Sequence, residues 1–101
     1  MAKQFSFKNV KKSILPVELN DNTQIILTIP SKGTMNKLAS MNGKTLDLDS
    51  IYEIATDIFN QNKEKRRFTQ QEIEDSFDLE DMLAFMQAYM EFISEVQHQK
   101  N

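Results

Sequence analysis

The residue types that most often carry enzyme chemistry are missing or scarce in this chain of 101 residues. It has no Cys, which excludes disulfides, thiolate metal ligands and cysteine nucleophiles. Its one His, His98, lies close to the end of the chain, which argues against most histidine-based catalysis and histidine-rich metal sites. Two Gly, Gly33 and Gly43, are too few for a glycine-rich phosphate loop. The sequence therefore argues against an enzyme and predicts no catalytic residue, no cofactor and no metal site.

Long apolar runs are absent as well. No run approaches the roughly 18 residues that a membrane-spanning helix needs, and residues 1–10 lack the apolar segment of a secretory signal. We therefore expect no membrane partner. The apolar content of 40% and the charged content of 27% are ordinary for a folded chain. The length fits one domain, which we place at residues 1–97, with a polar tail at residues 98–101.

Charge is distributed unevenly, although the net charge is only −3. Residues 1–45 hold seven Lys and two acids, a balance of +5, whereas residues 46–101 hold five basic residues and thirteen acids, a balance of −8. Such a split suits head-to-tail contact between copies, which would build rings or spirals. It equally suits neutralisation between the two halves of one domain, and both interpretations stay open.

The first thirty residues form the β part of the predicted fold. Phe5–Val10 alternates in the manner of a strand, with its two phenylalanines on one face. Pro16–Leu19 and Thr23–Ile29 predict an antiparallel hairpin, because Asn20-Asp21-Asn22 between them is typical of a turn. Pro30 ends the last strand. The residues that share the apolar face of this strand are Ile25, Leu27 and Ile29.

Residues 31–97 form the helical part, a bundle of three to four helices, so the fold class is α+β. The first helix has Ser31 or Thr34 as its cap and stops at Gly43. A second helix runs from Ser50 to Gln61 and begins with a capping box. Thr69 opens a short helix through Ile73 with a second capping box, and Asp78 caps the longest helix, Leu79 to about Gln97.

Two charged clusters have structural and functional interpretations. The basic segment Asn62–Arg67 follows a helix C-terminus, where cations favour the dipole, and it lacks the aromatic residues of a nucleic-acid site. We therefore expect no nucleic acid. Paired carboxylates can bind a metal or transfer protons, but the acidic cluster lies at two helix N-termini, where the dipole favours negative charge. Its members are Glu72, Glu74, Asp75, Asp78, Glu80 and Asp81.

The final helix carries the strongest functional signal. Its apolar residues cover about 180° of the helical wheel, wider than the roughly 100° that a core-facing stripe needs. We expect the Leu79–Leu83–Met86–Met90–Ile93 side to face the core and the Phe85–Tyr89–Phe92 edge to stay available to a partner. Methionine suits surfaces that accept varied apolar sequences. The candidate partner-binding residues are Met82, Phe85, Met86, Tyr89, Met90 and Phe92.

From about Phe5 to Val96 the chain resembles the small tail assembly chaperones of long-tailed phages that infect Gram-positive bacteria. The resemblance rests on the order and length of the segments FSFKNV, VELNDNTQIILTIP, LDLDSIYEIATDIFNQN and FTQQEIEDSFDLEDMLAFMQAYMEFISEV. Its final helix is acidic first and apolar afterwards. It implies an interaction protein without catalytic residues.

The resemblance also implies a partner and a place. Such chaperones act in the host cytoplasm on the tape measure protein, a long and largely helical chain that sets tail length. They are thought to coat its apolar segments until the tail tube protein replaces them, and they are absent from the mature virion. They are often made in two lengths by a −1 ribosomal frameshift, and the ending Gln99-Lys100-Asn101 permits a slippery codon run without proving one.

A second class of function stays open. A small acidic regulatory or inhibitory module, antitoxin-like in character, would mask a basic partner with the same carboxylates. Salt separates the two classes, because binding by apolar burial survives moderate salt, whereas an acidic mask weakens as salt screens it.

Overall fold

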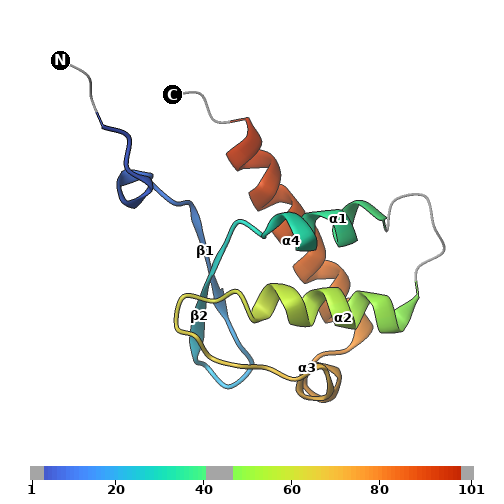
Figure 1. Ribbon diagram of the computed structural model, residues 1–101. Helices are drawn as coiled ribbons and strands as arrows, with labels where there is room; N and C mark the ends of the chain where they lie inside the picture. The colour runs from blue at the N-terminus through green and yellow to red at the C-terminus, as the bar shows by residue number, and fades with distance from the viewer. Residues whose placement is uncertain (1–3, 41–46, 99–101) are drawn as a thin grey trace.

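The structure is a computed structural model that describes residues 4–40 and 47–98. Its elements, in chain order, are a 3-10 turn η1 (Phe7–Asn9), strands β1 (Ile14–Glu18) and β2 (Gln24–Thr28), and helices α1 (Lys32–Ser40), α2 (Leu48–Phe59), α3 (Gln70–Ser76) and α4 (Leu79–Gln97). A two-stranded antiparallel hairpin followed by four helices confirms the predicted α+β fold. In Figure 1 the hairpin, α1 and α3 lie around α2, and α4 crosses behind it.

The hairpin forms as the alternation predicts, and one of its faces enters the core. Leu15 pairs with Leu27 and Val17 pairs with Ile25, so these four side chains share one face. Ile25 and Leu27 are fully buried. The predicted turn at residues 20–22 joins the strands. The apolar face of β2 is therefore the first wall of the core.

The outer edge of β2 is covered by side chains and backbone from later in the chain. The Ile26 N–H donates to Glu64 Oε1, and the Lys63 N–H donates to Ile26 O, both at 2.9 Å. Two residues on, the Tyr89 hydroxyl donates to Thr28 O at 2.8 Å. The opposite edge belongs to β1, whose central residue is a proline that has no N–H to offer. Neither edge is well suited to extending the sheet with another strand.

A buried asparagine just after α2 organises the basic segment that follows. Asn62 is 6% exposed, and its Nδ2 group donates to Phe59 O and to Arg66 O, both at 2.7 Å. Its Oδ1 accepts the Arg66 N–H at 2.9 Å. The segment folds back into a tight loop in which Lys65 takes a positive φ of 59°. This loop presents Lys63 and Glu64 to the edge of β2.

The two residues before Asn62 tie α2 to other parts of the chain. Asn60 pairs with the backbone of Phe68, accepting its N–H at 2.7 Å and donating to its carbonyl at 2.9 Å. Gln61 accepts the Ser31 N–H at 3.3 Å and donates to the Thr34 hydroxyl at 2.8 Å, which fixes the start of α1. The end of α2 is therefore hydrogen-bonded to α1 on one side and to the approach to α3 on the other.

One apolar core lies between the hairpin, α2, α3 and α4. It draws residues from every one of these elements, and α2 and α4 contribute five each. Tyr89 from α4 and Phe59 from α2 are its two largest fully buried side chains. The core residues are Leu19, Ile25, Leu27, Leu38, Ile51, Ile54, Ala55, Ile58, Phe59, Phe68, Ile73, Met82, Met86, Tyr89, Phe92 and Ile93.

The predicted starts of α3 and α4 are confirmed. Thr69 accepts the Glu72 N–H and Glu72 returns a carboxylate to the Thr69 N–H, which is a complete capping box. Asp78 and Asp81 form the same reciprocal pair at the start of α4. At α1, the Thr34 N–H donates to Ser31 Oγ, so Ser31 is the cap of the two candidates.

Two expectations are wrong. Phe5–Val10 is not a strand, because the described part of the chain holds only β1 and β2, which pair with each other, and Ser6 instead accepts the Lys8 N–H to start a 3-10 turn. The second helix begins at Leu48, not at Ser50. The Ser50 hydroxyl donates to the side chain of Asp47, the N-cap residue, so no capping box forms there.

Some expectations fall on residues outside the described ranges. These are the helix stop at Gly43 and the chain end at residues 99–101. Among residues 4–40 and 47–98, no helix combines the length and the hydropathy needed to cross a membrane.

The hydrogen bonds that Asn62 makes to Phe59 and Arg66, called here the Asn62 clamp, can be tested by measuring the stability of a variant. Asn62→Ala removes three hydrogen bonds, one of them a buried bond to Phe59 O and two of them part-buried bonds to the backbone of Arg66. We expect a loss of about 2–4 kcal/mol of unfolding free energy in urea titrations. Lys63→Ala is the matched control, because its side chain is exposed and its backbone N–H is kept, so the change should be within about 0.5 kcal/mol. Equal stability of the two variants would contradict the clamp.

The buried tyrosine predicts a loss of stability at alkaline pH. Burial raises the pKa of Tyr89 above its ordinary value of about 10. A raised folded-state pKa means that the stabilisation is complete below pH ~10 and is lost as pH rises beyond it, by up to about 1.4 kcal/mol per pH unit. Tyr89→Phe should reduce this slope and cost about 1–3 kcal/mol at pH 8, because Thr28 O loses its donor. The free energy of unfolding is measured by urea titration at pH 8, 10 and 11 for both proteins. The same dependence on pH in the two proteins would contradict this assignment.

Candidate interaction surface

Helix α4 packs on the rest of the molecule through one side of its helical wheel. At 100° per residue its five buried residues fall within an arc of about 120°. That arc is close to what one core requires of a helix. The buried residues are Met82, Met86, Tyr89, Phe92 and Ile93.

An aromatic row fixes which side of α4 faces inward. The Phe85 ring meets the Phe59 ring of α2 edge-on, with centroids 4.9 Å apart. Phe85 stacks on Tyr89 at 5.9 Å, and Tyr89 lies 6.0 Å from Phe92. Tyr89 then reaches the hairpin through its hydroxyl. Such aromatic contacts contribute about 0.5–1.5 kcal/mol per pair beyond area burial, so this edge of α4 is held firmly.

The expected division of α4 between core and surface is therefore wrong. The edge that was expected to stay available to a partner faces the core. Tyr89 and Phe92, expected on the available edge, are 0% and 7% exposed, and Phe85, which stacks on Tyr89, is half-buried. Of the other candidate residues, Met82 and Met86 are also buried, whereas Met90 is exposed. The physical reason is Phe59, which offers the Phe85 edge an aromatic partner inside the core.

The opposite edge of the arc is the one left uncovered. Leu79, Leu83 and Met90 are 41%, 44% and 45% exposed and lie within about 40° of one another on the wheel. These three residues are called the apolar stripe. The width of the apolar arc predicts more apolar surface than one core needs, but no signal in the sequence indicates which edge stays free. Leu79 and Leu83 were consequently missed as surface residues.

The rim of the apolar stripe is polar and acidic. Gln87, Ser94 and Glu80 follow it on the wheel, and α4 contains four acids and no basic residue. The acids of α4 are Glu80, Asp81, Glu91 and Glu95. An apolar stripe beside an acidic surface suits a partner that is apolar and neutral or basic.

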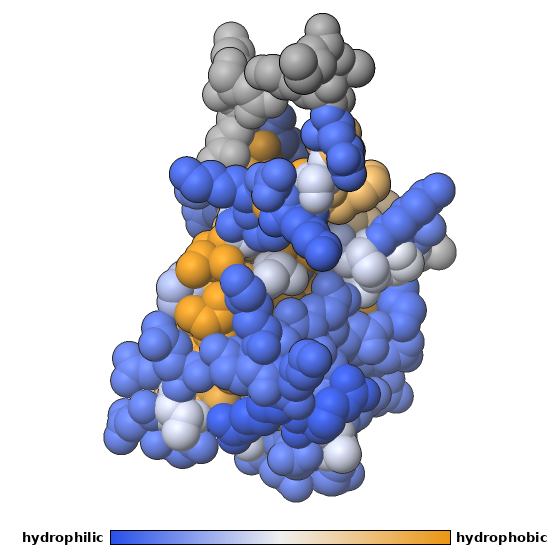
Figure 2. Space-filling model, turned by 60° about the vertical axis from the view of Figure 1, so that its left-hand side comes forward, coloured by the Kyte–Doolittle hydropathy of each residue, from blue (hydrophilic) through white to orange (hydrophobic). Residues whose placement is uncertain are grey.

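A second exposed apolar feature lies before β1. Phe5 and Phe7 are 69% and 81% exposed, and their rings meet each other edge-on with centroids 4.9 Å apart. They belong to the segment before β1, residues 4–13, which includes η1, is called here the arm and projects from the body of the molecule in Figure 1. The alternation of Phe5–Val10 predicts a strand, so the exposure of these two rings was not expected. The space-filling view in Figure 2 shows a few hydrophobic patches set in a largely hydrophilic surface.

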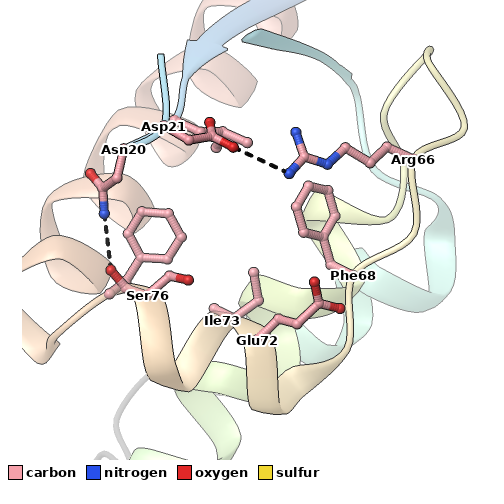
Figure 3. Close-up of a pocket in the computed structure, with 9 residues that line it drawn as sticks. Asn20, Asp21, Arg66, Phe68, Glu72, Ile73 and Ser76 are labelled. Atoms are coloured by element: carbon pink, nitrogen blue, oxygen red, sulfur yellow. Dashed lines mark hydrogen bonds and ion pairs between the residues drawn. The ribbon is translucent and has the colours of Figure 1, made fainter. Parts of the chain in front are cut away.

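A small cleft lies between the hairpin turn and α3 (Figure 3). Its volume is about 130 Å³, and its apolar lining includes Phe68 and Ile73. On its rim, Asn20 Nδ2 donates to Ser76 O at 2.9 Å, and Arg66 lies 3.7 Å from Asp21. The volume is well below the 300 Å³ or more of ordinary ligand pockets, and these rim groups are already paired. The cleft is therefore a weak candidate for small-molecule binding.

The charged clusters have structural partners. Arg66 of the basic segment donates to the Thr23 hydroxyl at 2.9 Å and lies 4.8 Å over the Phe68 ring, so it braces the hairpin turn. Hydrogen bonds from Thr23 lower the pKa of Asp21 in that turn. In the acidic cluster, Glu72, Asp78 and Asp81 serve the capping boxes. Among residues 4–40 and 47–98, no group of three or more His, Cys, Asp or Glu is placed to hold a metal.

Comparisons with known proteins do not indicate a function, so the proposal below is argued from the geometry of the surface. Searches against protein-family models, curated proteins and solved structures found no match to this chain.

The reversed assignment of α4 can be tested with one charge placed on either edge. Phe92→Glu puts a carboxylate into the core and removes a buried ring, so it should cost at least about 3 kcal/mol. Leu83→Glu adds the same charge to an exposed position and should change stability by less than about 1 kcal/mol. Thermal melts followed by circular dichroism compare the two. A melting temperature for Phe92→Glu equal to that of Leu83→Glu would contradict the assignment.

Proposed function

We propose that this protein is a tail assembly chaperone of long-tailed phages, which binds apolar helical segments of the tape measure protein along the apolar stripe of α4. It would act in the host cytoplasm during assembly, give way to the tail tube protein, and be absent from the mature virion. The observation that carries the proposal is the stripe itself, three large apolar side chains left 41–45% exposed on the longest helix.

The spacing of the stripe suits a helical partner. Leu79, Leu83, Met86 and Met90 follow one another at intervals of four, three and four residues, which is the heptad spacing of helices that pack side by side. Met86 lies at the border of the core and is 9% exposed. A partner helix laid along this line would cover the stripe without disturbing the residues beneath it. This is the helix-in-groove type of recognition.

Apolar burial supplies the expected binding energy. A half-exposed Leu or Met gains about 1 kcal/mol when it is fully covered. Three such residues give a modest contribution, so one copy would bind one segment weakly and reversibly. Weak, reversible binding by many copies along a long chain is what a coat that must later be displaced requires.

The alternative, an acidic module that masks a basic partner, has one observation in its favour. Helix α4 holds four acids and no basic residue, and Glu74 and Asp75 of α3 add to the same charge. Against it, half of the carboxylates of the acidic cluster serve helix caps. A mask would lose its affinity between 50 mM and 500 mM salt, whereas the stripe would keep most of its affinity over this range, up to about 0.5 M.

The binding test uses two double variants of α4 that carry the same added charge. The protein is co-expressed with the product of the largest neighbouring open reading frame and recovered by pull-down. Leu83→Glu with Met90→Glu should weaken binding at least tenfold, because the loss of about 2 kcal/mol of apolar contact exceeds the 1.4 kcal/mol that corresponds to a factor of ten.

Ala84→Glu with Ala88→Glu is the matched control. Both alanines are exposed and lie on the other side of the helix from the stripe, so this variant should bind as the unaltered protein does. Equal loss in both variants would mean that added negative charge weakens binding wherever it lies on α4, and it would refute the stripe as the site. Stronger binding by both variants would favour the acidic mask, because added carboxylates attract a basic partner. Full binding by the stripe variant would refute the proposed site.

A further inference from the structure

The arm exposes more aromatic surface than any other part of the described chain. Phe7 and Phe5 have the highest exposure of its large apolar residues. They are held in a defined arrangement, because Ser6 caps η1 and the two rings contact each other edge-on at 88°. A preformed aromatic pair loses little conformational entropy when it docks.

The arm also stands apart from the body to which it is attached. Between its last residues and the end of β2 lies a hollow of about 340 Å³, lined by Lys12, Ser13, Thr28, Ile29 and Pro30. The arm and the apolar stripe therefore remain uncovered together in one chain. Their charges are the observation that relates the two surfaces to each other.

The two surfaces are complementary in charge as well as in character. The arm holds Lys8, Lys11 and Lys12 and no acid, and all three lysines are exposed. Within the described residues, the ion pairs involve Lys37 and Arg66 and leave these three lysines out. Helix α4 has the opposite charge, with four acids and no basic residue. A basic aromatic segment and an acidic apolar helix attract each other at a distance and bury apolar surface on contact.

We propose that the arm of one copy docks on α4 of a second copy, with Phe5 and Phe7 on the stripe Leu79–Leu83–Met90 and the arm lysines among the α4 acids. The contact joins two different surfaces, so it is heterologous. Every copy offers one arm and one stripe, and the association continues from copy to copy into a chain or a closed ring. The area of one arm is small compared with a standard interface, so the contact is transient and depends on concentration.

A mixing experiment tests this contact without any other partner. Phe5→Ser with Phe7→Ser leaves a copy that can only accept an arm, and Leu83→Glu with Met90→Glu leaves a copy that can only donate one. By multi-angle light scattering at rising concentration, the unaltered protein should grow beyond a dimer, whereas each variant alone should stay at the mass of one chain. An equimolar mixture of the two variants should give a complex of two chains and no larger.

Two results would overturn the proposal. One is an unaltered protein that remains a single chain at every concentration in low salt. The other is a mixture of the two variants in which no two-chain complex forms. Ala84→Gln with Ala88→Gln serves as the control and should assemble as the unaltered protein does, because both alanines lie away from the stripe and the change adds no charge among the α4 acids.

The absence of cysteine provides a direct readout of the geometry. Phe7→Cys in one copy and Leu83→Cys in another give a mixture in which each chain has a single thiol. Oxidation by an added disulfide reagent should join the two variants to each other at least fivefold more than it joins Phe7→Cys to Ala84→Cys. Equal yields for the two pairs would refute the docking site.

Discussion

Three consecutive amide side chains at the end of α2 hold the fold together. Asn60, Gln61 and Asn62 hydrogen-bond to three separate segments, the approach to α3, the start of α1 and the loop that covers the edge of β2. Backbone groups in the interior must find partners, because a buried group without one costs about 1–3 kcal/mol. These segments are irregular and cannot satisfy themselves by helix or sheet bonding. The amides do so instead, and they fix α2 as the element on which the others are assembled.

The position of α2 decides which edge of α4 faces the surface. Phe59, next to the amides, receives Phe68 and Phe77 from the α3 region and Phe85 from α4. Once Phe85 lies on Phe59, the rotation of α4 is determined, and Tyr89 is directed to the carbonyl of β2 that the loop leaves free. The Leu83 side of the helix then has nothing to rest on. The uncovered stripe is thus a consequence of aromatic packing at the opposite edge.

Local signals predicted most of the fold, and long-range packing decided the rest. The hairpin and the capping boxes at Thr69 and Asp78 depend on neighbouring residues, so they could be read from the sequence. The width of the apolar arc on α4 was also readable, but its orientation depends on Phe59, more than twenty residues away. The strand prediction for Phe5–Val10 was wrong for a related reason. Its alternation fits a strand, but the described part of the fold supplies no neighbouring strand to pair with it. The hydrogen bonds of Asn60, Gln61 and Asn62 could not be predicted, because these three residues form no periodic sequence pattern and their partners lie in other segments.

The two proposed contacts use the same stripe, so they compete with each other. If both hold, a stripe occupied by a neighbour's arm is closed to a client helix, and client binding must release the arm. The stronger contact prevails by mass action. An arm-bound assembly would then keep the apolar stripe covered while no client is present, and exposed client segments would draw copies out of it. Such exchange needs both contacts to be weak, which agrees with the small area of the arm and with the half-buried state of the three stripe residues.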